Sequence, residues 1–407
     1  MTQQASGFTI LSNTVDLGGA AVSAFGTLET AELTPLIQLD FIYGINPQMG
    51  ASTVSGAGAT VDVNAARLRI QSGTGSAGSA VYQSRKTIRY RPGQGCVARW
   101  TTAFGTAYAS NTQITGAGTS QDGYFFGYNG TAFGLSIRAR GSDTWVAQTA
   151  WNGDKCDGSG PSVFTINPQF GNVYQVKYPF LGYGTIRYYI QNPVTGAWIL
   201  VHTIAYPNTT TATQLGNPAL NFYAQQLNSG NTTNSTLYVG SVGMFLSGER
   251  VFVGSPKWAT DADKGSITTE AALLNLKNCT SYNGVANKGL LRLNAVMFAS
   301  TAAHVAFFRF KLGATIGGSP SYTPVNGSTS DGGATLTSAN SMASVDTAGT
   351  YTSGGLYLFG ISALGNNSLL DLTNYDIFVA PGEILTITGA CSNSTEIGCA
   401  LDWSEDS

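Results

Sequence analysis

Residues that could carry acid–base, nucleophilic or metal chemistry are few in this sequence, and they are scattered. It contains two histidines, His202 and His304, and each lies inside an apolar, strand-like run. A histidine-based triad or a multi-histidine metal centre is difficult to build from them. Glycan-cleaving sandwiches use two carboxylates across a cleft, and no strand-like segment here carries a dense acidic pair. We therefore expect no catalytic residue, no cofactor and no metal, and we predict that the chain is not an enzyme.

Two short segments match parts of ligand-binding motifs without the context that those motifs need. Residues 154–160 could offer two carboxylates and a glycine-rich turn to a calcium ion, but an ordinary turn held by aspartate side chains is the favoured interpretation. Residues 73–78 have the glycine spacing of a dinucleotide-binding loop, yet they open no helix and lie in a run of Gly, Ser and Ala. Neither segment predicts a bound ligand.

Aromatic side chains offer a different chemistry, because their flat rings can stack on sugar rings. The aromatic residues that look exposed are Tyr124, Tyr128, Trp145 and Trp151. Of these we take Tyr128, Trp145 and Trp151 as candidate glycan-stacking residues. The neighbouring Phe125 and Phe126 are predicted to pack in a core instead.

The elements that must position these side chains are strands. Of 407 residues, 51 are glycine and only 10% are charged, compared with roughly 25% in an average globular protein. Strong helix formers are scarce, whereas Val, Ile, Thr, Tyr and Phe recur between turn residues. Hydrophobic residues at 43% supply enough apolar surface for folded cores. An all-β chain follows, and its length favours two domains.

Charge and apolar patterning argue against nucleic acid and membrane as partners. Twenty basic and 22 acidic residues give a formal net charge of −2 and are spread along the chain, so there is no basic footprint for nucleic acid. No apolar run has the length of a membrane span, and the N-terminus lacks the basic start and apolar run of a secretion signal. We therefore expect no nucleic acid and no membrane as partners, and synthesis in a cytoplasm.

Strand-like runs separated by turn signals predict two antiparallel, jelly-roll-like β-sandwich domains preceded by an extended N-terminal arm. A charged stretch near the middle of the chain, with a possible short helix at residues 270–276, marks the boundary. The predicted divisions are a docking arm (1–35), a large concanavalin-like sandwich (36–248), a linker (249–277) and a C-terminal sandwich (278–407).

Turn chemistry makes two local predictions. The pair Asn129-Gly130 tolerates positive φ and lies between aromatic runs, so it predicts a hairpin over residues 124–138. The pair Pro381-Gly382 fits a type II turn between two strands.

The five cysteines form no C-x-x-C pair, and their odd number does not describe a disulfide scaffold. Cys391 and Cys399 flank a short turn and could bond across a hairpin. Buried apolar thiols are the favoured interpretation for most of the five.

Several segments of the sequence resemble segments of structural proteins of tailed phages and some large DNA viruses. They are QSR (83–85), YRPGQG (90–95), DGYFFGYNGTAFG (122–134), WNGD (151–154), GNVY (171–174), LGYG (181–184) and the strand-joining APGE (380–383). The resemblance spans about two thirds of the chain and implies concanavalin-type or jelly-roll sandwiches displayed on virions. It implies no catalytic residues.

We therefore expect a non-enzymatic virion structural protein, a decoration, spike or fibre component exposed on a capsid or tail and assembled in the host cytoplasm. It would act through self-association, with a trimer as the predicted oligomer, and through docking to other capsid or tail proteins. The alternative is a carbohydrate-binding adhesin that recognises a host surface glycan through Tyr128, Trp145 or Trp151. A glycan-cleaving enzyme is the third class.

Overall fold

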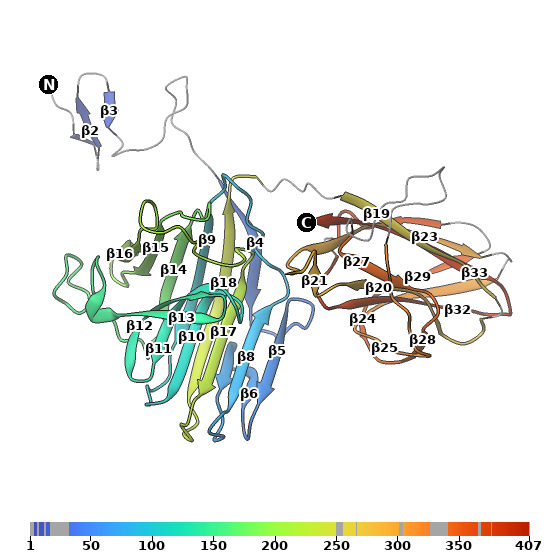
Figure 1. Ribbon diagram of the computed structural model, residues 1–407, viewed down its shortest axis with the longest axis horizontal. Helices are drawn as coiled ribbons and strands as arrows, with labels where there is room; N and C mark the ends of the chain where they lie inside the picture. Colours follow the sequence, from blue (N-terminus) through green and yellow to red (C-terminus); the bar gives the residue numbers. More distant parts are fainter. Residues whose placement is uncertain are drawn as a thin grey trace.

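The computed structural model describes residues 32–249, 255–265, 267–300, 304–325, 341–364, 368–375 and 377–406, together with three short N-terminal strands. Strands dominate, and they form two antiparallel β-sandwiches that lie side by side (Figure 1). The predicted fold class, all-β with two antiparallel sandwich domains, is confirmed. Among the described residues, no helix is long and apolar enough to cross a membrane.

The first sandwich consists of a seven-stranded and an eight-stranded sheet. In spatial order the seven-stranded sheet holds β13 (Ser142–Ala147), β12 (Ala132–Ala139), β11 (Gly123–Asn129), β10 (Asn111–Gly118), β17 (Asn221–Asn228), β8 (Ser79–Ser84) and β5 (Gly50–Ser55). The other sheet holds β16 (Trp198–Ile204), β15 (Ile186–Gln191), β14 (Asn172–Tyr178), β9 (Cys96–Ala103), β18 (Thr236–Ser247), β7 (Arg67–Gln71) and β6 (Thr60–Asn64), with β4 (Leu33–Asp40) paired to β18. One 3₁₀ turn, η1 (Gln148–Ala150), follows β13.

An aromatic core joins these two sheets. Trp100 of β9 lies 6.1 Å from Tyr174 and 6.2 Å from Phe126 between ring centroids. Its indole nitrogen donates a 2.8 Å hydrogen bond to Thr115 of the opposite sheet, so the polar atom of this buried ring has a partner. The core therefore fixes β11, β10 and β9 in one register relative to each other.

The second sandwich also has two sheets. One holds β19 (Ser255–Lys264), β33 (Ile397–Asp406), β23 (Leu290–Ser300) and β30 (Ser368–Asp371), with β31 (Phe378–Val379) also paired to β23. The other holds β26 (Thr323–Pro324), β27 (Ala343–Asp346), β20 (Ala271–Asn278), β32 (Ile384–Cys391), β24 (Val305–Leu312) and β29 (Leu356–Leu364). Two small ribbons pair β21 (Ser281–Tyr282) with β22 (Val285–Ala286), and β25 (Thr315–Gly317) with β28 (Thr350–Ser353).

The second sandwich begins earlier in the chain than the sequence indicated. The predicted linker, residues 249–277, contains β19 and most of β20, which pair with β33 and β32. The helix expected at residues 270–276 is wrong, because Leu273, Leu274 and Leu276 are fully buried between the sheets. Burial between two sheets overrides a weak helical preference in so short a segment.

The two predicted turns are present, one of them displaced by a residue. β11 and β12 form the expected hairpin, but the two turn residues are Gly130 and Thr131, since Asn129 already pairs with Ala132. Gly130 has a φ of 60°, as expected for glycine at the first central position of a type II′ turn. Gly382 has a φ of 86°, as a type II turn requires.

The predicted docking arm, residues 1–35, lies largely outside the described residues. Within it, β1 (Gln4–Ala5), β2 (Phe8–Leu11) and β3 (Thr14–Asp16) form a small antiparallel sheet. The arm is also shorter than predicted, because β4 of the first sandwich begins at Leu33.

Cys391 and Cys399 do not face each other across one hairpin. Cys391 lies on β32 beside Ala306, whereas Cys399 lies on β33 beside Phe298, in the opposite sheet. Both side chains are buried, as expected for apolar thiols.

Candidate functional site

One cross-strand row on the outer face of the seven-stranded sheet collects aromatic and polar side chains. Alternate residues of β11, beginning with Tyr124 and Phe126, point into the main core, so Phe125 points to the other face. The strand register places six residues in this row, which we call the platform row: Trp145, Ser136, Phe125, Gly116, Tyr223 and Gln83. Five steps at the usual spacing of neighbouring strands make the row about 24 Å long.

Trp145 is the exposed member of this aromatic group. Ile114, Phe125 and Tyr223 form a separate small cluster with exposed fractions of 0%, 0% and 3%. Trp145 is half-buried and packs against that cluster from the edge strand β13. Its indole is therefore fixed by packing on one side and accessible on the other.

Two glycines, Gly118 and Gly123, leave space for the Phe125 ring to lie against the sheet. A Cβ atom on Gly118 would lie 2.1 Å from Cζ of Phe125, and one on Gly123 would lie 2.5 Å from it. The phenyl ring therefore occupies the space that side chains at these two positions would fill. Larger residues there would force the ring out of place.

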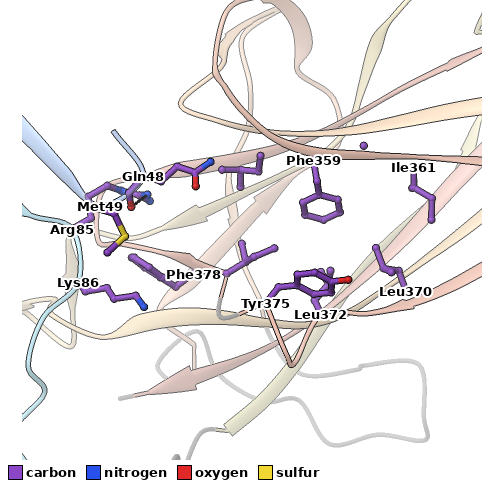
Figure 2. Close-up of a pocket in the computed structure, with 13 residues that line it drawn as sticks. Gln48, Met49, Arg85, Lys86, Phe359, Ile361, Leu370, Leu372, Tyr375 and Phe378 are labelled. Atoms are coloured by element: carbon purple, nitrogen blue, oxygen red, sulfur yellow. Dashed lines mark hydrogen bonds between the residues drawn. The ribbon is translucent and has the colours of Figure 1, made fainter. Parts of the chain in front are cut away.

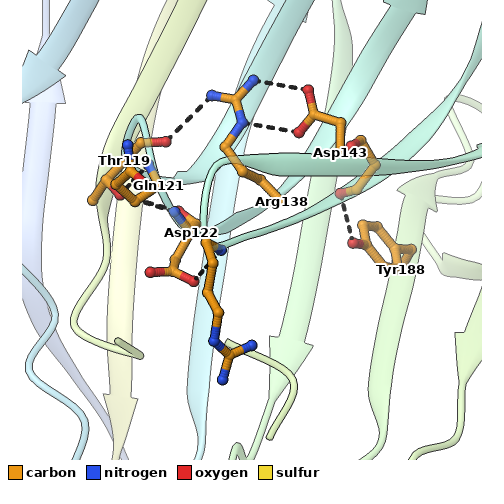
Figure 3. A network of polar contacts seen from close by, with 8 residues as sticks. Thr119, Gln121, Asp122, Arg138, Asp143 and Tyr188 are labelled. Carbon is orange, nitrogen blue, oxygen red and sulfur yellow. Dashed lines mark hydrogen bonds and ion pairs between the residues drawn. The ribbon is translucent and has the colours of Figure 1, made fainter. Parts of the chain in front are cut away.

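Arg138 covers the aromatic floor beside the platform row. Its guanidinium carbon lies 5.2 Å from the centroid of Phe125 and 5.8 Å from that of Tyr223. Nε and Nη2 donate hydrogen bonds of 2.9 Å each to the two carboxylate oxygens of Asp143, and Nη1 donates to the Thr119 carbonyl (Figure 3). Burial lowers the pKa of Arg138, but the hydrogen bond and charge of Asp143 raise it more, so this side chain stays a cation.

A second acidic residue anchors the turn on which this arrangement rests. The Thr119 hydroxyl accepts hydrogen bonds from the backbone N–H groups of Gln121 and Asp122, at 3.0 and 3.1 Å (Figure 3). The Asp122 carboxylate in turn accepts backbone hydrogen bonds from Arg140 and Gly216. These contacts fix the Thr119 carbonyl to which Arg138 donates.

Several polar atoms on this face are buried and have no hydrogen-bond partner among the described residues. They include the hydroxyl of Ser136, which lies between Phe125 and Trp145 in the row, and Oε1 of Gln225, whose residue pairs with Ile114 and Val81. A buried polar atom without a partner is costly and needs an explanation such as a bound molecule. Both atoms lie beneath the surface of the face, close to the aromatic cluster.

Of the predicted glycan-stacking residues, the structure leaves only Trp145 accessible. Tyr128 and Trp151 are 8% and 3% exposed and belong to the main core, where both contact Phe133. Their assignment as stacking residues is wrong because no ring face is open to a ligand. The alternation in β11 could have shown this, since Tyr128 shares a face with Phe126, which was expected in the core. Phe125 has the opposite parity and lies on the outer face.

The loop at residues 154–160 is organised by aspartate turns. Asp154 accepts backbone hydrogen bonds from Cys156 at 2.8 Å and Ser162 at 2.7 Å, and Asp157 accepts one from Ser159 at 2.9 Å. Within the described part of the chain, no three His, Cys, Asp or Glu side chains are grouped as a metal site would require. His202 accepts a hydrogen bond from the Asn152 backbone at 3.1 Å, and burial lowers its pKa.

A cavity of about 670 Å³ lies where the two sandwiches meet. The first sandwich contributes Gln48, Met49, Arg85 and Lys86 at one end of it. The second sandwich contributes the larger, apolar part, which includes Phe359, Ile361, Leu370 and Leu372 (Figure 2). Arg85 donates from Nε to Oε1 of Glu383 at 2.5 Å and from Nη2 to Oε2, so an ion pair joins the two domains beside the cavity.

No protein-family model matches the sequence, and no curated protein matches it. Among solved structures, the chain is similar to the endo-1,3-beta-glucanase from Streptomyces sioyaensis, with 10% identity, 53% of this chain and 97% of that chain covered, and a TM-score of 0.39. It is similar to the carbohydrate recognition domain of Emp47p, with 10% identity, coverages of 54% and 98%, and a TM-score of 0.33. It is also similar to the Crh5 transglycosylase, with 12% identity, coverages of 55% and 89%, and a TM-score of 0.36.

Similarity at this level extends over about half of the chain and carries no argument about activity. The fold class therefore rests on the sheet order and strand register given above.

Proposed function

We propose that this chain binds an extended carbohydrate across the platform row of the first sandwich, with Trp145 as the main stacking residue. The observation that carries the proposal is the half-buried Trp145 indole, fixed against Ile114, Phe125 and Tyr223 on an otherwise polar outer face. A rigid aromatic ring with one open side supplies contact area at a low cost in conformational entropy.

The groups around Trp145 support a polar ligand rather than an apolar one. Gln83 and Gln225 present half-buried side-chain amides further along the face. Amides and hydroxyls both donate and accept hydrogen bonds, as sugar hydroxyls do. Within the row, Trp145 and Gln83 have partly exposed side chains while Ser136, Phe125 and Tyr223 are buried, so the contacts we propose fall at its two ends.

We propose binding without cleavage. Glycosidases of the common types need a pair of carboxyl groups, one of which acts as an acid. Among the described residues beside the platform row, Asp143 supplies a carboxylate, and both of its oxygens accept hydrogen bonds from Arg138. This carboxylate is therefore engaged in a two-point ion pair that holds Arg138 over the aromatic rings.

A polysaccharide array with the full chain tests this proposal. We expect binding to at least one extended polysaccharide, loss of that binding in Trp145→Ala, and no release of reducing sugar from the bound polymer. Absence of binding by the wild-type chain, or full retention of it in Trp145→Ala, would contradict carbohydrate recognition by this face. Release of reducing sugar would contradict only the claim that binding occurs without cleavage.

A second candidate function is the structural role in a virion that the sequence resemblance implies. The observation that favours a role in assembly is a group of exposed apolar side chains on the second sandwich, among them Phe307, Tyr357, Leu369 and Tyr375, with exposed fractions of 45% to 66%. Exposed apolar surface of this kind marks protein interfaces. Immunogold labelling of purified particles would support the virion role, and a chain found only outside particles would contradict it.

A further inference from the structure

The second sandwich is open along one side, between the edge strands of its two sheets. β29 is the last strand of the six-stranded sheet, and β30 is the last strand on the corresponding side of the other sheet. The cavity of about 670 Å³ lies between them, with Phe359 and Ile361 of β29 on one wall and Leu370 and Leu372 on the other (Figure 2). We call this opening the seam. Side chains that would normally be sealed in a sandwich core therefore line it.

β29 lacks the charged side chains and prolines with which natural proteins protect an edge strand, and its one irregularity is a register shift at Leu358 in the pairing with β24. It is nine residues long, reads Leu-Tyr-Leu-Phe-Gly-Ile-Ser-Ala-Leu and contains no charged residue and no proline. Among the described residues, β24 is the one strand that pairs with it, and none of the described backbone groups bonds to its other edge. A long, apolar, uncharged edge of this kind is a template for pairing with another strand.

The other edges of the same sandwich are protected. β19 carries Pro256 and Lys257, and β26 is two residues long and ends in Pro324. β30 has four residues and ends in Asp371. The contrast within one domain indicates that the bare edge of β29 has a partner in the working protein.

In the first sandwich, a loop of the same chain covers an uncharged edge strand. This strand, β16, accepts hydrogen bonds from a neighbouring loop, at 3.0 Å from Gly153 to Val201 and 3.0 Å from Asp154 to Leu200. No described loop does the same for β29.

Exposed apolar side chains extend the seam outward. Tyr357 on β29, Leu369 on β30 and Tyr375 after β30 are 52%, 66% and 66% exposed. These side chains add exposed apolar surface to the strands that border the seam, and apolar surface is what permanent interfaces between identical subunits bury.

We propose that β29 pairs antiparallel with β29 of a second copy of this chain, joining the two six-stranded sheets and closing both seams in a two-fold symmetric dimer. A second copy is the occupant that fits, because two-fold pairing sets a strand against itself. An edge with no charge has no like charges to oppose in that arrangement. This interface differs from the trimer that the sequence suggested, and it lies on the second sandwich, away from the platform row.

Sedimentation velocity over a range of concentrations tests the proposal on the full chain. The wild type is expected to sediment with twice the mass of one chain. Ser362→Lys places a charge on the exposed side of β29 and is expected to raise the dimer dissociation constant about tenfold or more. The matched control is Ser55→Lys, which adds the same charge at an exposed position of the edge strand β5.

Hydrogen exchange provides a second readout that does not depend on a variant. Amides of residues 356–364 are expected to gain protection as the concentration rises and the dimer forms. A wild type that stays monomeric at all concentrations would overturn the proposal. So would a dimer that Ser362→Lys leaves intact, or one that forms without new protection of β29.

Discussion

At the scale of single residues, the outer face of the first sandwich depends on one buried cation. Arg138 is 8% exposed, spans Phe125 and Tyr223 and is neutralised by a two-pronged contact with Asp143. A guanidinium can make both hydrogen bonds and stack on the rings at the same time, whereas a lysine ammonium cannot. This side chain therefore supports the surface against which Trp145 packs.

Arg138→Lys is expected to lower the free energy of unfolding of the first sandwich by about 1–2 kcal/mol and to weaken carbohydrate binding, because the paired hydrogen bonds and the ring contact are lost. Urea unfolding followed by tryptophan fluorescence measures the first effect. Arg140→Lys is the matched control, since among the described residues the Arg140 side chain donates to exposed Thr213 alone. Equal losses in the two variants would contradict the role given to Arg138.

At the scale of elements, the β11–β12 hairpin shows how a turn fixes which side chains face outward. The turn at Gly130 and Thr131 sets Phe125 opposite Ser136, and the same register sets Ser136 opposite Trp145. A slip of one residue would move Phe125 into the core and Phe126 out of it. The geometry of the turn therefore contributes directly to the platform row.

Gly130→Ala is expected to destabilise the first sandwich by about 1 kcal/mol. The reason is the backbone, because φ is 60° and an added Cβ would meet no atom closer than 4.0 Å. Gly171→Ala is the control, since it also adds a Cβ in open space but its φ is not positive. Thermal unfolding of both variants measures the difference. Matching unfolding temperatures would contradict a strained turn.

Much of the strand and turn structure could be predicted from the sequence. The errors in turn position and in the burial of aromatic residues have physical causes. Asn129-Gly130 predicted the hairpin because glycine tolerates positive φ, but either residue could begin the turn, so its position was off by one. Strand alternation was enough to place Tyr128 inside with Phe126. Trp151 carries no such signal, because it follows η1 in a loop and is buried only through tertiary packing on Phe126 and Phe133.

The seam on the second sandwich could not be predicted either. The composition of β29 is visible in the sequence, but its position at the edge of a sheet is set by which strands pair with it. The same apolar run in the centre of a sheet would need no partner. Only the order of the strands distinguishes the two cases.

At the scale of the whole molecule, Arg85 holds the two sandwiches together. It pairs with Glu383 of the second domain, donates to the Gln48 carbonyl at 2.9 Å and lies 5.1 Å from the ring centroid of Phe378. Its side chain is 8% exposed, so this pair is screened far less than a surface salt bridge. Arg85 therefore contributes to the relative orientation of the two domains, together with contacts such as Lys86 on the Phe378 ring.

Arg85→Ala is expected to loosen that orientation while each sandwich stays folded. Small-angle scattering should show a larger radius of gyration, and amides near Met49 and Val379 should exchange faster. Arg187→Ala, at an exposed position of β15, is the control. Unchanged scattering and exchange in Arg85→Ala would mean that other contacts fix the two domains.

The most direct test of carbohydrate recognition is calorimetric titration of one bound polysaccharide with the wild type, Trp145→Ala and Trp258→Ala. Trp258 is 49% exposed on β19 of the second sandwich, so its removal controls for the loss of a surface tryptophan. We expect Trp145→Ala to weaken binding about 30-fold, or about 2 kcal/mol, as a central aromatic contact should, and Trp258→Ala to leave it unchanged. Equal affinity of the wild type and Trp145→Ala would contradict the platform row as the binding site.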